Sequence, residues 1–338
     1  MVLAAGLGTR LWPLTRSLPK PLLPVAGTPL LSRTLAEFQE AGCEAVALNL
    51  FHQGEKISAH FGSHFDDMEL VYSWEEELQG TLGALAPLEG FFAPADVLVV
   101  INGDSLSRWP IERLVERHQR GSAQATLLLT SRADPKAFGG GVGVDAAGRI
   151  VSFSPEREHG VVEQRLVFAG AHAFAPSLVA GRDRQPEDFI TDLYEPLLEA
   201  GGVIQSLETS RPWYDLGTPA RYLEGVCDWI RRRGGGRVGG RTWVSPEAKV
   251  SEGASVRRAV IESGVVIETQ AEVERAVVLP GARVGRGAVV RESILGFSVR
   301  LGAGTSVERR MVTVARADRP LGPLDSVVGG LVYSPLDV

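Results

Sequence analysis

The feature that most constrains the fold is a repeat of aliphatic residues in the last third of the chain. Val244, Val250 and Val256 follow one another in steps of six, and a step of five leads to Ile261, where the next cycle begins. The same spacing continues through Ile267, Val273, Val278, Val284, Val290, Leu295, Leu301 and Val307 to Val312. A step of six does not keep side chains on one helical face. Three short strands per cycle, each with one inward aliphatic residue, instead predict a parallel β-helix whose stacked coils share a core.

The preceding part of the chain has a different pattern, in which short apolar runs alternate with helical ones. The apolar runs lack polar alternation, which is typical of buried strands, and they lie at 45–50, 97–101 and 126–130. Helices are predicted over 29–41, ending at Gly42, and over 111–120. Strands that alternate with helices indicate an α/β domain with a mostly parallel sheet.

The boundary between these two patterns is predicted at "RRRGGGRVGGR", because arginines and glycines alone cannot form a core. This charged stretch is expected to form a solvated turn. The predicted organisation is an α/β domain over 1–230, a linker over 231–242, a β-helix domain over 243–316 and a C-terminal tail over 317–338.

Composition excludes several classes of function. The net charge of −6 argues mildly against a nucleic-acid binder, and no apolar run approaches the roughly 20 residues of a membrane span. Cys43 and Cys227 are interpreted as reduced, buried thiols of a cytoplasmic protein. Because Met1 is followed at once by an apparent strand interior, we expect either a start further upstream or an unusually short first strand. The acidic run at 74–77 is predicted to be a solvated face.

The opening stretch "AAGLGTRLWPLTRSLPKPLLPV" predicts a loop that binds phosphate. Gly6 and Gly8 would let backbone N–H groups converge on an anion. The stretch is not a P-loop, and Leu11 stands where the dinucleotide-binding fingerprint needs its third glycine. Arg10 adds a planar charge, and Lys20 lies between two prolines that stiffen the backbone around it. Cations held in this way are suited to charge stabilisation.

The run "LAAGLGTRLWPLTRSLPKPLLPVAGTPLL" resembles the signature of sugar-1-phosphate nucleotidylyltransferases, with Thr28 where a lysine is common. The resemblance continues through "NGDS" at 102–105, "FAGAHAF" at 168–174 and "WYDLGTPARYLEG" at 213–225. It extends to the repeat, since many members carry a C-terminal left-handed β-helix. The resemblance therefore implies a Rossmann-like, mostly parallel sheet domain followed by a left-handed β-helix of hexapeptide repeats.

Two aspartates stand at positions that suit ligand binding. Asp104 follows a buried strand, and ligands of open α/β sheets bind at that edge. Asp215 precedes Thr218 and Pro219, which form a strong helix start. From the residues alone, either aspartate could be a helix cap or a metal ligand. The resemblance implies that Asp104 and Asp215 together bind Mg²⁺, which prefers oxygen ligands and bridging phosphates.

The resemblance also implies the reaction and the site residues. A nucleoside triphosphate and a sugar 1-phosphate would give a nucleotide sugar and pyrophosphate, by in-line attack of an already anionic phosphate oxygen on the α-phosphorus. The implied catalytic residues are Arg10, Lys20 and Asp104. The implied nucleotide-binding residues are Leu3, Ala4, Ala5, Gly6, Gly8, Thr9, Gly80, Thr81, Gly83, Asn102 and Gly103. The implied sugar-binding residues are Gly141, Gly170 and Asp215.

The substrates are less well defined by the sequence. The segments "NGDS" and "GTLGAL" look most like members that use GTP and a manno-configured sugar 1-phosphate, of mannose or heptose. UTP or dTTP with glucose 1-phosphate or MurNAc 1-phosphate stays an alternative. The lysine that commonly reaches the sugar phosphate is missing at Ser154–Pro155–Glu156, and Arg157 and Arg165 are candidates to replace it. A non-catalytic, nucleotide-sugar-binding regulatory subunit is a second alternative. The β-helix is expected to mediate assembly into a homo-oligomer.

Overall fold

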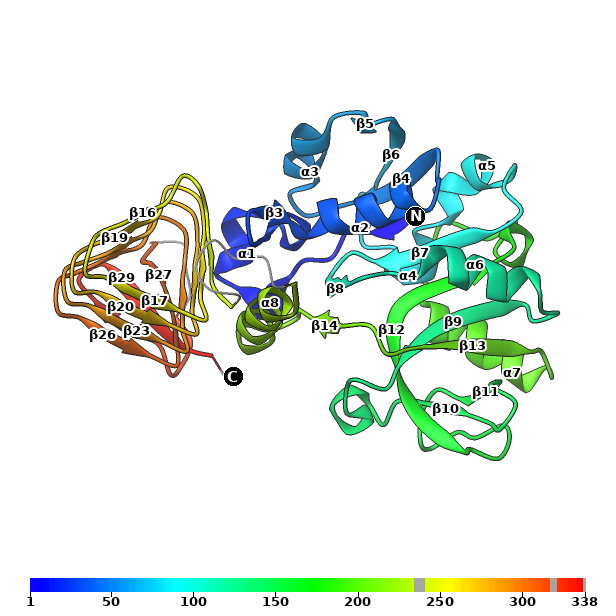
Figure 1. Cartoon of the computed structure of the whole chain (residues 1–338). Coiled ribbons are helices and arrows are strands. Elements are labelled where there is room, and N and C mark those ends of the chain that lie inside the picture. The colour runs from blue at the N-terminus through cyan, green and yellow to red at the C-terminus, as the bar shows by residue number, and fades with distance from the viewer. Residues whose placement is uncertain (234–240, 317–320, 337–338) are drawn as a thin grey trace. The chain divides into compact units, whose positions relative to one another are not determined.

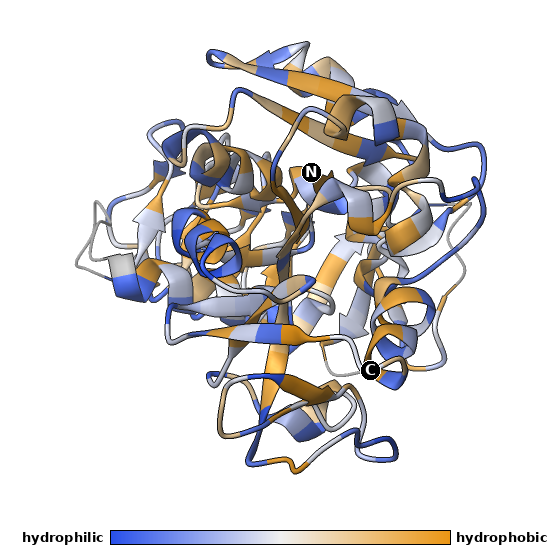
Figure 2. Cartoon of the chain, turned by 90° about the vertical axis from the view of Figure 1, so that its right-hand side faces the viewer, coloured by the Kyte–Doolittle hydropathy of each residue, from blue (hydrophilic) through white to orange (hydrophobic). Residues whose placement is uncertain are grey.

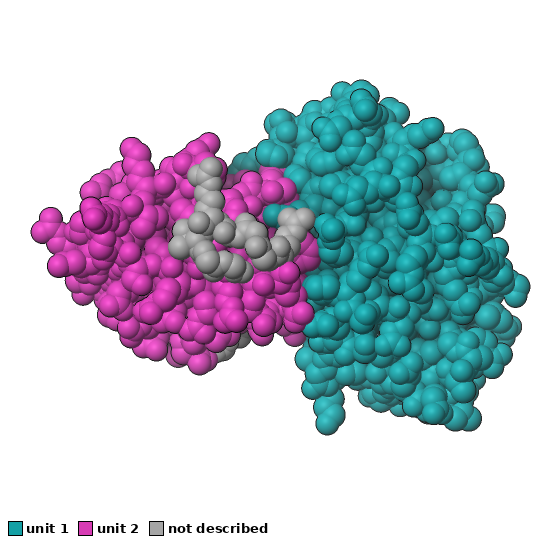
Figure 3. Space-filling view, in the orientation of Figure 1, with its two compact units in different colours: residues 1–7, 31–213 teal, residues 8–30, 214–338 magenta. Residues whose placement is uncertain are grey.

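The computed structural model describes residues 1–233, 241–316 and 321–336. By its internal contacts the chain forms two compact units, which Figure 3 colours separately. Unit 1 comprises Met1–Leu7 and Leu31–Trp213, and unit 2 comprises Gly8–Leu30 and Tyr214–Val338. Most of the opening glycine stretch thus belongs to the unit that contains the β-helix.

Unit 1 is built on a mixed ten-stranded sheet of the described residues. Its centre is parallel, because β1 (Val2–Leu3) pairs in parallel with both β4 (Ala45–Leu50) and β7 (Leu98–Asn102). The other strands of this sheet are β5 (His64–Phe65), β6 (Met68–Trp74), β9 (Ala125–Thr130), β10 (Val142–Val144), β11 (Ile150–Ser152), β12 (Gln164–Phe174) and β13 (Ile204–Thr209). The three predicted buried strands are confirmed as β4, β7 and β9.

The helices of the sheet domain carry both apolar and polar sides, as the colouring of Figure 2 shows. They are α2 (Leu30–Glu40), α3 (Gly54–Phe61), α4 (Gly80–Gly83), α5 (Glu89–Phe92), α6 (Ile111–Gln119) and α7 (Glu195–Glu199). The predictions over 29–41 and 111–120 are confirmed as α2 and α6. Helix α2 ends at Gly42 in a left-handed conformation (φ 76°), with Cys43 N donating to Phe38 O (3.1 Å).

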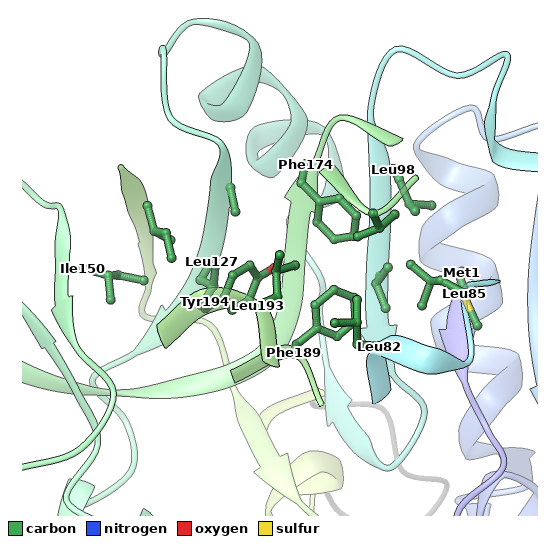
Figure 4. Close-up of a cluster of buried hydrophobic side chains, with 14 of the residues drawn as sticks. Met1, Leu82, Leu85, Leu98, Leu127, Ile150, Phe174, Phe189, Leu193 and Tyr194 are labelled. Atoms are coloured by element: carbon green, nitrogen blue, oxygen red, sulfur yellow. The ribbon is translucent and has the colours of Figure 1, made fainter. Parts of the chain in front are cut away.

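The core of unit 1 lies between the sheet and the helices that cover it (Figure 4). Its labelled members are Met1, Leu82, Leu85, Leu98, Leu127, Ile150, Phe174, Phe189, Leu193 and Tyr194. The amino group of Met1 is buried here and donates to Val99 O (2.7 Å), and burial lowers its pKa to about 5. The first strand, β1, comprises two residues.

The repeat in unit 2 forms a parallel β-helix, as predicted. In the ladder that begins at Trp243, the paired residues are Val260, Val277, Ile294 and Met311, so neighbouring coils are offset by one cycle of the repeat. Figure 1 shows the coils as nested triangles. The strands are β15 (Trp243–Val244), β16 (Lys249–Val250), β17 (Ser255–Arg257), β18 (Val260–Ile261), β19 (Val266–Ile267), β20 (Glu272–Glu274), β21 (Val277–Val278), β22 (Arg283–Val284), β23 (Val289–Arg291), β24 (Ile294–Leu295), β25 (Arg300–Leu301) and β26 (Ser306–Glu308).

The β-helix ends in antiparallel strands instead of a full fifth coil. β27 (Arg310–Val314) still pairs in parallel with β24, at the position where the fifth cycle was predicted to begin. β29 (Leu331–Pro335) then pairs with β27 in the antiparallel direction, and β28 (Ser326–Val328) pairs with β29. The described part of the predicted tail is therefore folded onto the β-helix.

Helix α8 (Pro219–Arg233) begins as predicted but ends later than predicted. Arg221 N donates to Thr218 Oγ1 (3.3 Å), so Thr218 caps the helix. The predicted linker over 231–242 is wrong at its start, because its first three residues belong to this helix. Asp228 accepts from Arg231 Nε (2.6 Å) and Arg232 Nε (2.7 Å), which supports the last turn. Residues 234–240 of that linker lie outside the described residues.

The glycine stretch is fastened to the β-helix within unit 2. It contains η1 (Thr9–Leu11), α1 (Leu14–Ser17), η2 (Lys20–Leu22), β2 (Pro24–Val25) and β3 (Thr28–Pro29). Gly27 N donates to Glu262 Oε2 (2.9 Å), and a β-carbon at Gly27 would lie 2.8 Å from the ring of Trp243. Tyr222 of α8 donates its hydroxyl to Pro24 O (2.6 Å). The hairpin β2–β3 is thus held by residues that come much later in the chain.

Candidate active site

In unit 1 the predicted residues gather where the central parallel strands end. Leu3 pairs with Asn102 in β7, and Gly103 N donates to Leu3 O (2.9 Å). A β-carbon at Gly103 would lie 2.6 Å from Leu3 O, so only glycine fits there. Asp104 follows directly, is half-buried, and accepts from Ser105 Oγ (3.3 Å). The carboxyl edge of the sheet is the usual ligand site of α/β folds.

Gly170 joins this edge from the neighbouring antiparallel strand. It lies in β12 with φ 84°, beside the pairing of Ala171 with Ile101 of β7. A β-carbon at Gly170 would lie 2.9 Å from Asn102 Nδ2. The predicted sugar-side glycine and the predicted nucleotide-side asparagine are therefore neighbours.

Helix α4 holds the predicted residues Gly80, Thr81 and Gly83 against the segment 185–189. β-carbons at Gly80 and Gly83 would lie 2.2 Å from Glu187 O and 2.1 Å from Gln185 O. Thr81 Oγ1 donates to Asp188 Oδ2 (2.8 Å) and accepts from Phe189 N (3.0 Å). Close packing alone explains these small residues, and their contact with a nucleotide stays a prediction.

Gly141 lies beside a guanidinium group. Its φ is 73°, and a β-carbon there would lie 2.6 Å from Leu166 O. Arg165 Nη1 donates to Gly141 O (3.3 Å), and Arg165 Nη2 pairs with Glu158 Oε1 (2.6 Å). Arg157 instead pairs with Glu199 (3.3 Å) on the surface. Of the two arginines considered from the sequence, Arg165 is the one next to the predicted sugar loop.

In unit 2, Gly8 turns the glycine loop. Its φ of 62° is left-handed, and a β-carbon would lie 3.2 Å from the side chain of Thr15. Thr15 Oγ1 donates to Gly8 O (2.7 Å), and Leu11 N donates to the same oxygen (3.0 Å). Thr9 follows at the start of the short helix η1 and is itself exposed.

Arg10 and Asp215 converge on Gly217. A β-carbon at Gly217 would lie 2.8 Å from Asp215 Oδ1 and 3.0 Å from Arg10 Nη2. Asp215 Oδ2 also pairs with Arg221 of α8. Lys20 is 7 % exposed, and its backbone lies in η2 between Pro19 and Pro21. Unit 2 therefore supplies two guanidinium groups near Asp215 and, separately, a buried lysine, and cations of these kinds are suited to phosphate.

The two predicted metal ligands belong to different units, Asp104 to unit 1 and Asp215 to unit 2. Within the described ranges, no group of three or more histidine, cysteine or acidic side chains could hold a metal ion. Two aspartate carboxylates supplemented by substrate phosphate oxygens form a donor set that fits a hard divalent cation. The residues present are therefore compatible with the predicted ion, and their shared ligation stays a prediction.

Sequence reasoning missed three residues next to these groups: Asn49, Glu75 and Arg221. Ala4 N donates to Asn49 Oδ1 (2.8 Å), and Asn49 Nδ2 donates to Glu75 Oε1 (2.7 Å). The prediction of a solvated acidic face over 74–77 is wrong at Glu75, which is partly buried and accepts two hydrogen bonds. The available signal was a polar residue, Asn49, within the otherwise apolar strand β4.

His172 lies in the same strand as Gly170 but belongs to the core. It is 2 % exposed, and its Nδ1 lies 2.5 Å from the hydroxyl of Tyr194. Burial lowers the pKa of His172 to about 3, so the imidazole is neutral near pH 7. Neither cysteine forms a disulfide, and each is partly buried, so the expectation of buried thiols is met only in part. Burial raises the pKa of the Cys43 thiol and brings that of Cys227 to about 12.

Two known families match the chain. The family described as "Nucleotidyl transferase" matches residues 1–231, and the family described as "GMPPB C-terminal domain" matches residues 238–330. The chain belongs to the nucleotidyl transferase family. Enzymes of this family act on a nucleoside triphosphate and a sugar 1-phosphate and use a divalent metal ion. No helix in the described ranges has both the length and the hydrophobicity needed to span a membrane.

Several curated relatives in the nucleotidyl transferase family carry one description. A mannose-1-phosphate guanylyltransferase of Mycobacterium tuberculosis is 32 % identical over 303 residues, which cover 81 % of this chain and 82 % of the relative. A mannose-1-phosphate guanylyltransferase catalytic subunit beta of Drosophila pseudoobscura is 28 % identical over 268 residues, which cover 76 % of this chain and 71 % of the relative.

Solved structures support the same fold. HddC from Yersinia pseudotuberculosis has a TM-score of 0.57 and 21 % identity, covering 68 % of this chain and 97 % of that one. A putative glucose-1-phosphate thymidylyltransferase from Bacillus anthracis has a TM-score of 0.57 and 24 % identity, covering 67 % and 92 %. At these identities the likeness extends to the fold alone.

Proposed function

We propose that this nucleotidyl transferase joins GTP and mannose 1-phosphate to form GDP-mannose and pyrophosphate. The observation that carries this proposal is the 32 % identity to a mannose-1-phosphate guanylyltransferase over four-fifths of both chains. The match of residues 238–330 to the GMPPB C-terminal domain supports it over the part of the chain that contains the β-helix. A heptose 1-phosphate with GTP is the nearest variant of the proposal. UTP or dTTP with glucose 1-phosphate or MurNAc 1-phosphate is the more distant one.

The chemistry needs positioning and charge neutralisation more than proton transfer. A phosphate oxygen of the sugar phosphate attacks the α-phosphorus in line, and pyrophosphate leaves from the opposite side. This nucleophile is anionic at neutral pH, so a general base is not required. Arg10 and Lys20 bear on the β- and γ-phosphates and stabilise the charge that develops on pyrophosphate.

The remaining predicted residues take the substrates. The nucleotide lies along the backbone of Leu3–Gly6, Gly8 and Thr9, with its base and ribose at Gly80–Gly83 and Asn102–Gly103. The sugar lies at Gly141 and Gly170. Asp104 and Asp215 would hold Mg²⁺, which would supply charge neutralisation at the phosphates. These roles are the ones that the family resemblance implies for these positions.

Arg165 replaces the missing lysine as the cation for the sugar phosphate. Both arginines pair with a glutamate, but only Arg165 also donates to Gly141 O in the predicted sugar loop, which supports this role. Arg165→Ala should raise the KM for the sugar phosphate about tenfold and leave the KM for the nucleotide within twofold. Arg157→Ala is the matched control, with both constants unchanged. Equal effects of the two variants would contradict the assignment.

A regulatory subunit that binds a nucleotide sugar without turnover is the second candidate, favoured by Ser154–Pro155–Glu156 in place of the common lysine motif. Pyrophosphate release separates the two. Each of ATP, GTP, UTP, dTTP and CTP is combined with mannose, heptose, glucose and MurNAc 1-phosphates, with Mg²⁺ or with EDTA. The proposal expects metal-dependent release that is highest for GTP with mannose 1-phosphate. Nucleotide-sugar binding with no release for any pair would favour the regulator.

The cellular setting follows from these substrates. Nucleoside triphosphates are cytoplasmic metabolites, so we place the protein in the cytoplasm. We further propose a homo-oligomer assembled through the β-helix, because stacked repeats present an extended surface of the kind that such proteins use for binding. Light scattering at micromolar protein would give more than one chain mass, and a monomer would contradict this part of the proposal.

A further inference from the structure

Two predicted nucleotide-binding segments of unit 1 are joined by a chain of hydrogen bonds that runs through two side chains. One segment is the backbone at Leu3–Gly6, and the other is helix α4 at Gly80–Gly83. The two segments lie far apart in the sequence. The linking side chains are Asn49 and Glu75, neither of which has a role in the reaction proposed above.

Asn49 lies at the start of this chain of hydrogen bonds. It is 3 % exposed in strand β4, where it pairs with Leu3 of β1. Ala4 N donates to Asn49 Oδ1 (2.8 Å), which fixes the orientation of the side-chain amide because only an oxygen can accept there. Asn49 Nδ2 then points its hydrogens at Glu75 Oε1 (2.7 Å). Asn49 therefore binds the first backbone N–H of the glycine loop on one side and a carboxylate on the other.

Glu75 continues the path toward helix α4. Its backbone N donates to Leu50 O (2.9 Å), which places it at the end of strands β4 and β6. Its Oε2 accepts from Gln79 N (3.0 Å). Gln79 O accepts from Glu187 N (3.0 Å), and Glu187 O accepts from Leu82 N (2.9 Å). One carboxylate thus accepts from both directions, while the neighbouring Glu76 and Glu77 are exposed.

We propose that Asn49 and Glu75 are positioning residues that hold the glycine loop and helix α4 at the spacing that a bound nucleotide requires. This inference rests on the proposed function, since it assigns the two segments to the phosphates and to the base and ribose. Hydrogen bonds to a carboxylate are stronger than those between neutral groups. Donors that are buried beside the carboxylate also have no water molecule to bond instead. A ligand that contacts both segments binds more tightly when their spacing is fixed beforehand, because binding then does not have to order the two segments.

The polarity of the chain of hydrogen bonds allows a sharp test. In Asn49→Asp, two carboxylates face each other where a hydrogen bond was made. In Glu75→Gln, the amide has only one oxygen, so either Asn49 Nδ2 or Gln79 N faces the NH₂ group of the new side chain instead of an acceptor. The double variant Asn49→Asp/Glu75→Gln reverses one bond and keeps the rest. Asp at 49 accepts from Ala4 N and from the new amide, whose oxygen accepts from Gln79 N. Both net charge and side-chain size are kept, so the double variant can rescue only through these contacts. Glu76→Gln is the matched control on the exposed neighbour.

Each single variant should raise the KM for the nucleoside triphosphate about tenfold or more, with a smaller effect on kcat and on the KM for the sugar phosphate. The double variant should return the nucleotide KM to within about threefold of the wild type, and Glu76→Gln should not change it. Unchanged KM in the single variants would overturn the inference. The inference would also be overturned if the increase in nucleotide KM in the double variant equalled the product of the increases in the two single variants.

Hydrogen exchange of the unliganded protein tests the same link without any turnover. Peptides that contain residues 3–6 and 79–83 should exchange faster in both single variants and at the wild-type rate in the double variant. Wild-type exchange in the single variants would overturn the inference whatever the activity. If exchange follows the expected cycle while the wild type turns over no substrate pair, the proposed function fails and the positioning link stands.

Discussion

The part of the candidate site that lies in unit 2 can be tested by the single substitution Gly217→Ala, which adds one methyl group beside Asp215 and Arg10. Gly217→Ala would place a β-carbon 2.8 Å from Asp215 Oδ1 and 3.0 Å from Arg10 Nη2. Both atoms end flexible side chains, and φ at Gly217 is not left-handed, so the fold should tolerate the change. We expect kcat/KM to fall about 100-fold, since misplacement by 1 Å can cost that much.

The control for this variant is Gly90→Ala, because a β-carbon at Gly90 meets no atom within 4 Å. Steady-state kinetics give the activity, and thermal unfolding should show both variants within a few degrees of the wild type. Full activity of Gly217→Ala would contradict the assignment of Arg10 to the phosphates and of Asp215 to the metal ion.

His172 predicts a dependence of stability on pH. Its pKa is about 3 in the folded chain against 6.5 ordinarily, because burial disfavours the charged form. Below pH 6.5 the unfolded chain takes up a proton that the folded chain refuses. The stability that neutral His172 contributes is therefore complete above pH 6.5 and is lost as the pH falls toward 3. Between pH 7.5 and pH 5 this loss is about 2 kcal/mol.

Urea unfolding of the wild type and of His172→Gln at those two pH values isolates this contribution. The variant should be spared that loss, because it lacks the imidazole. Parallel losses in the two proteins would show that His172 is protonated in the folded state.

At the scale of residues, the sequence was informative where a residue type has few uses. A lysine between two prolines and glycines beside an arginine pointed to charge and close approach before any contact was known. Asn49, Glu75 and Arg221 could not be found in this way, because asparagine, glutamate and arginine are common on surfaces. Their significance comes from partners that the fold brings to them, such as the Ala4 N–H for Asn49.

Gly80 in helix α4 could be required for its left-handed backbone or for its lack of a side chain, and a comparison with Gly42 separates the two. Gly80 has φ 73° and would place a β-carbon 2.2 Å from Glu187 O, whereas Gly42 has φ 76° and nothing within 4 Å. Gly42→Ala should cost about 1 kcal/mol of unfolding free energy, which is the cost of the left-handed conformation. Gly80→Ala should cost at least twice as much, because a backbone oxygen must move.

Urea unfolding measures both costs, and nucleotide KM provides the functional readout. Gly80→Ala should raise this KM, because the displaced segment carries Thr81 and its partner Asp188. Gly42→Ala should leave it unchanged. Equal costs in the two variants would mean that α4 has room to move away from Glu187.

At the scale of elements, periodicity predicted what lies inside each helix or strand better than where it ends. The buried strands β4, β7 and β9 and the helices α2 and α6 appear where apolar spacing and a terminal glycine placed them. The end of α8 was missed, because glycines after the arginines suggested a linker. Asp228 binds Arg231 and Arg232 and carries the helix further, which is a pairing that composition does not reveal.

At the scale of the molecule, the regular cycle of aliphatic residues was enough to predict the β-helix, because each coil repeats the same register against the next. The grouping of the glycine stretch with that β-helix was beyond sequence reasoning. It depends on Gly27, whose N–H finds Glu262 and whose missing side chain leaves room for Trp243. Contacts between segments this far apart in the chain leave no local pattern in the sequence.

The central claim, a guanylyltransferase acting by attack on the α-phosphorus, is tested most directly by following the oxygen atoms. The protein is given GTP, Mg²⁺ and mannose 1-phosphate labelled with ¹⁸O at its terminal phosphate oxygens, and the products are weighed by mass spectrometry. The account predicts GDP-mannose that retains all of the label, together with unlabelled pyrophosphate in equal amount. Label in pyrophosphate, or no GDP-mannose while GTP is bound, would contradict it.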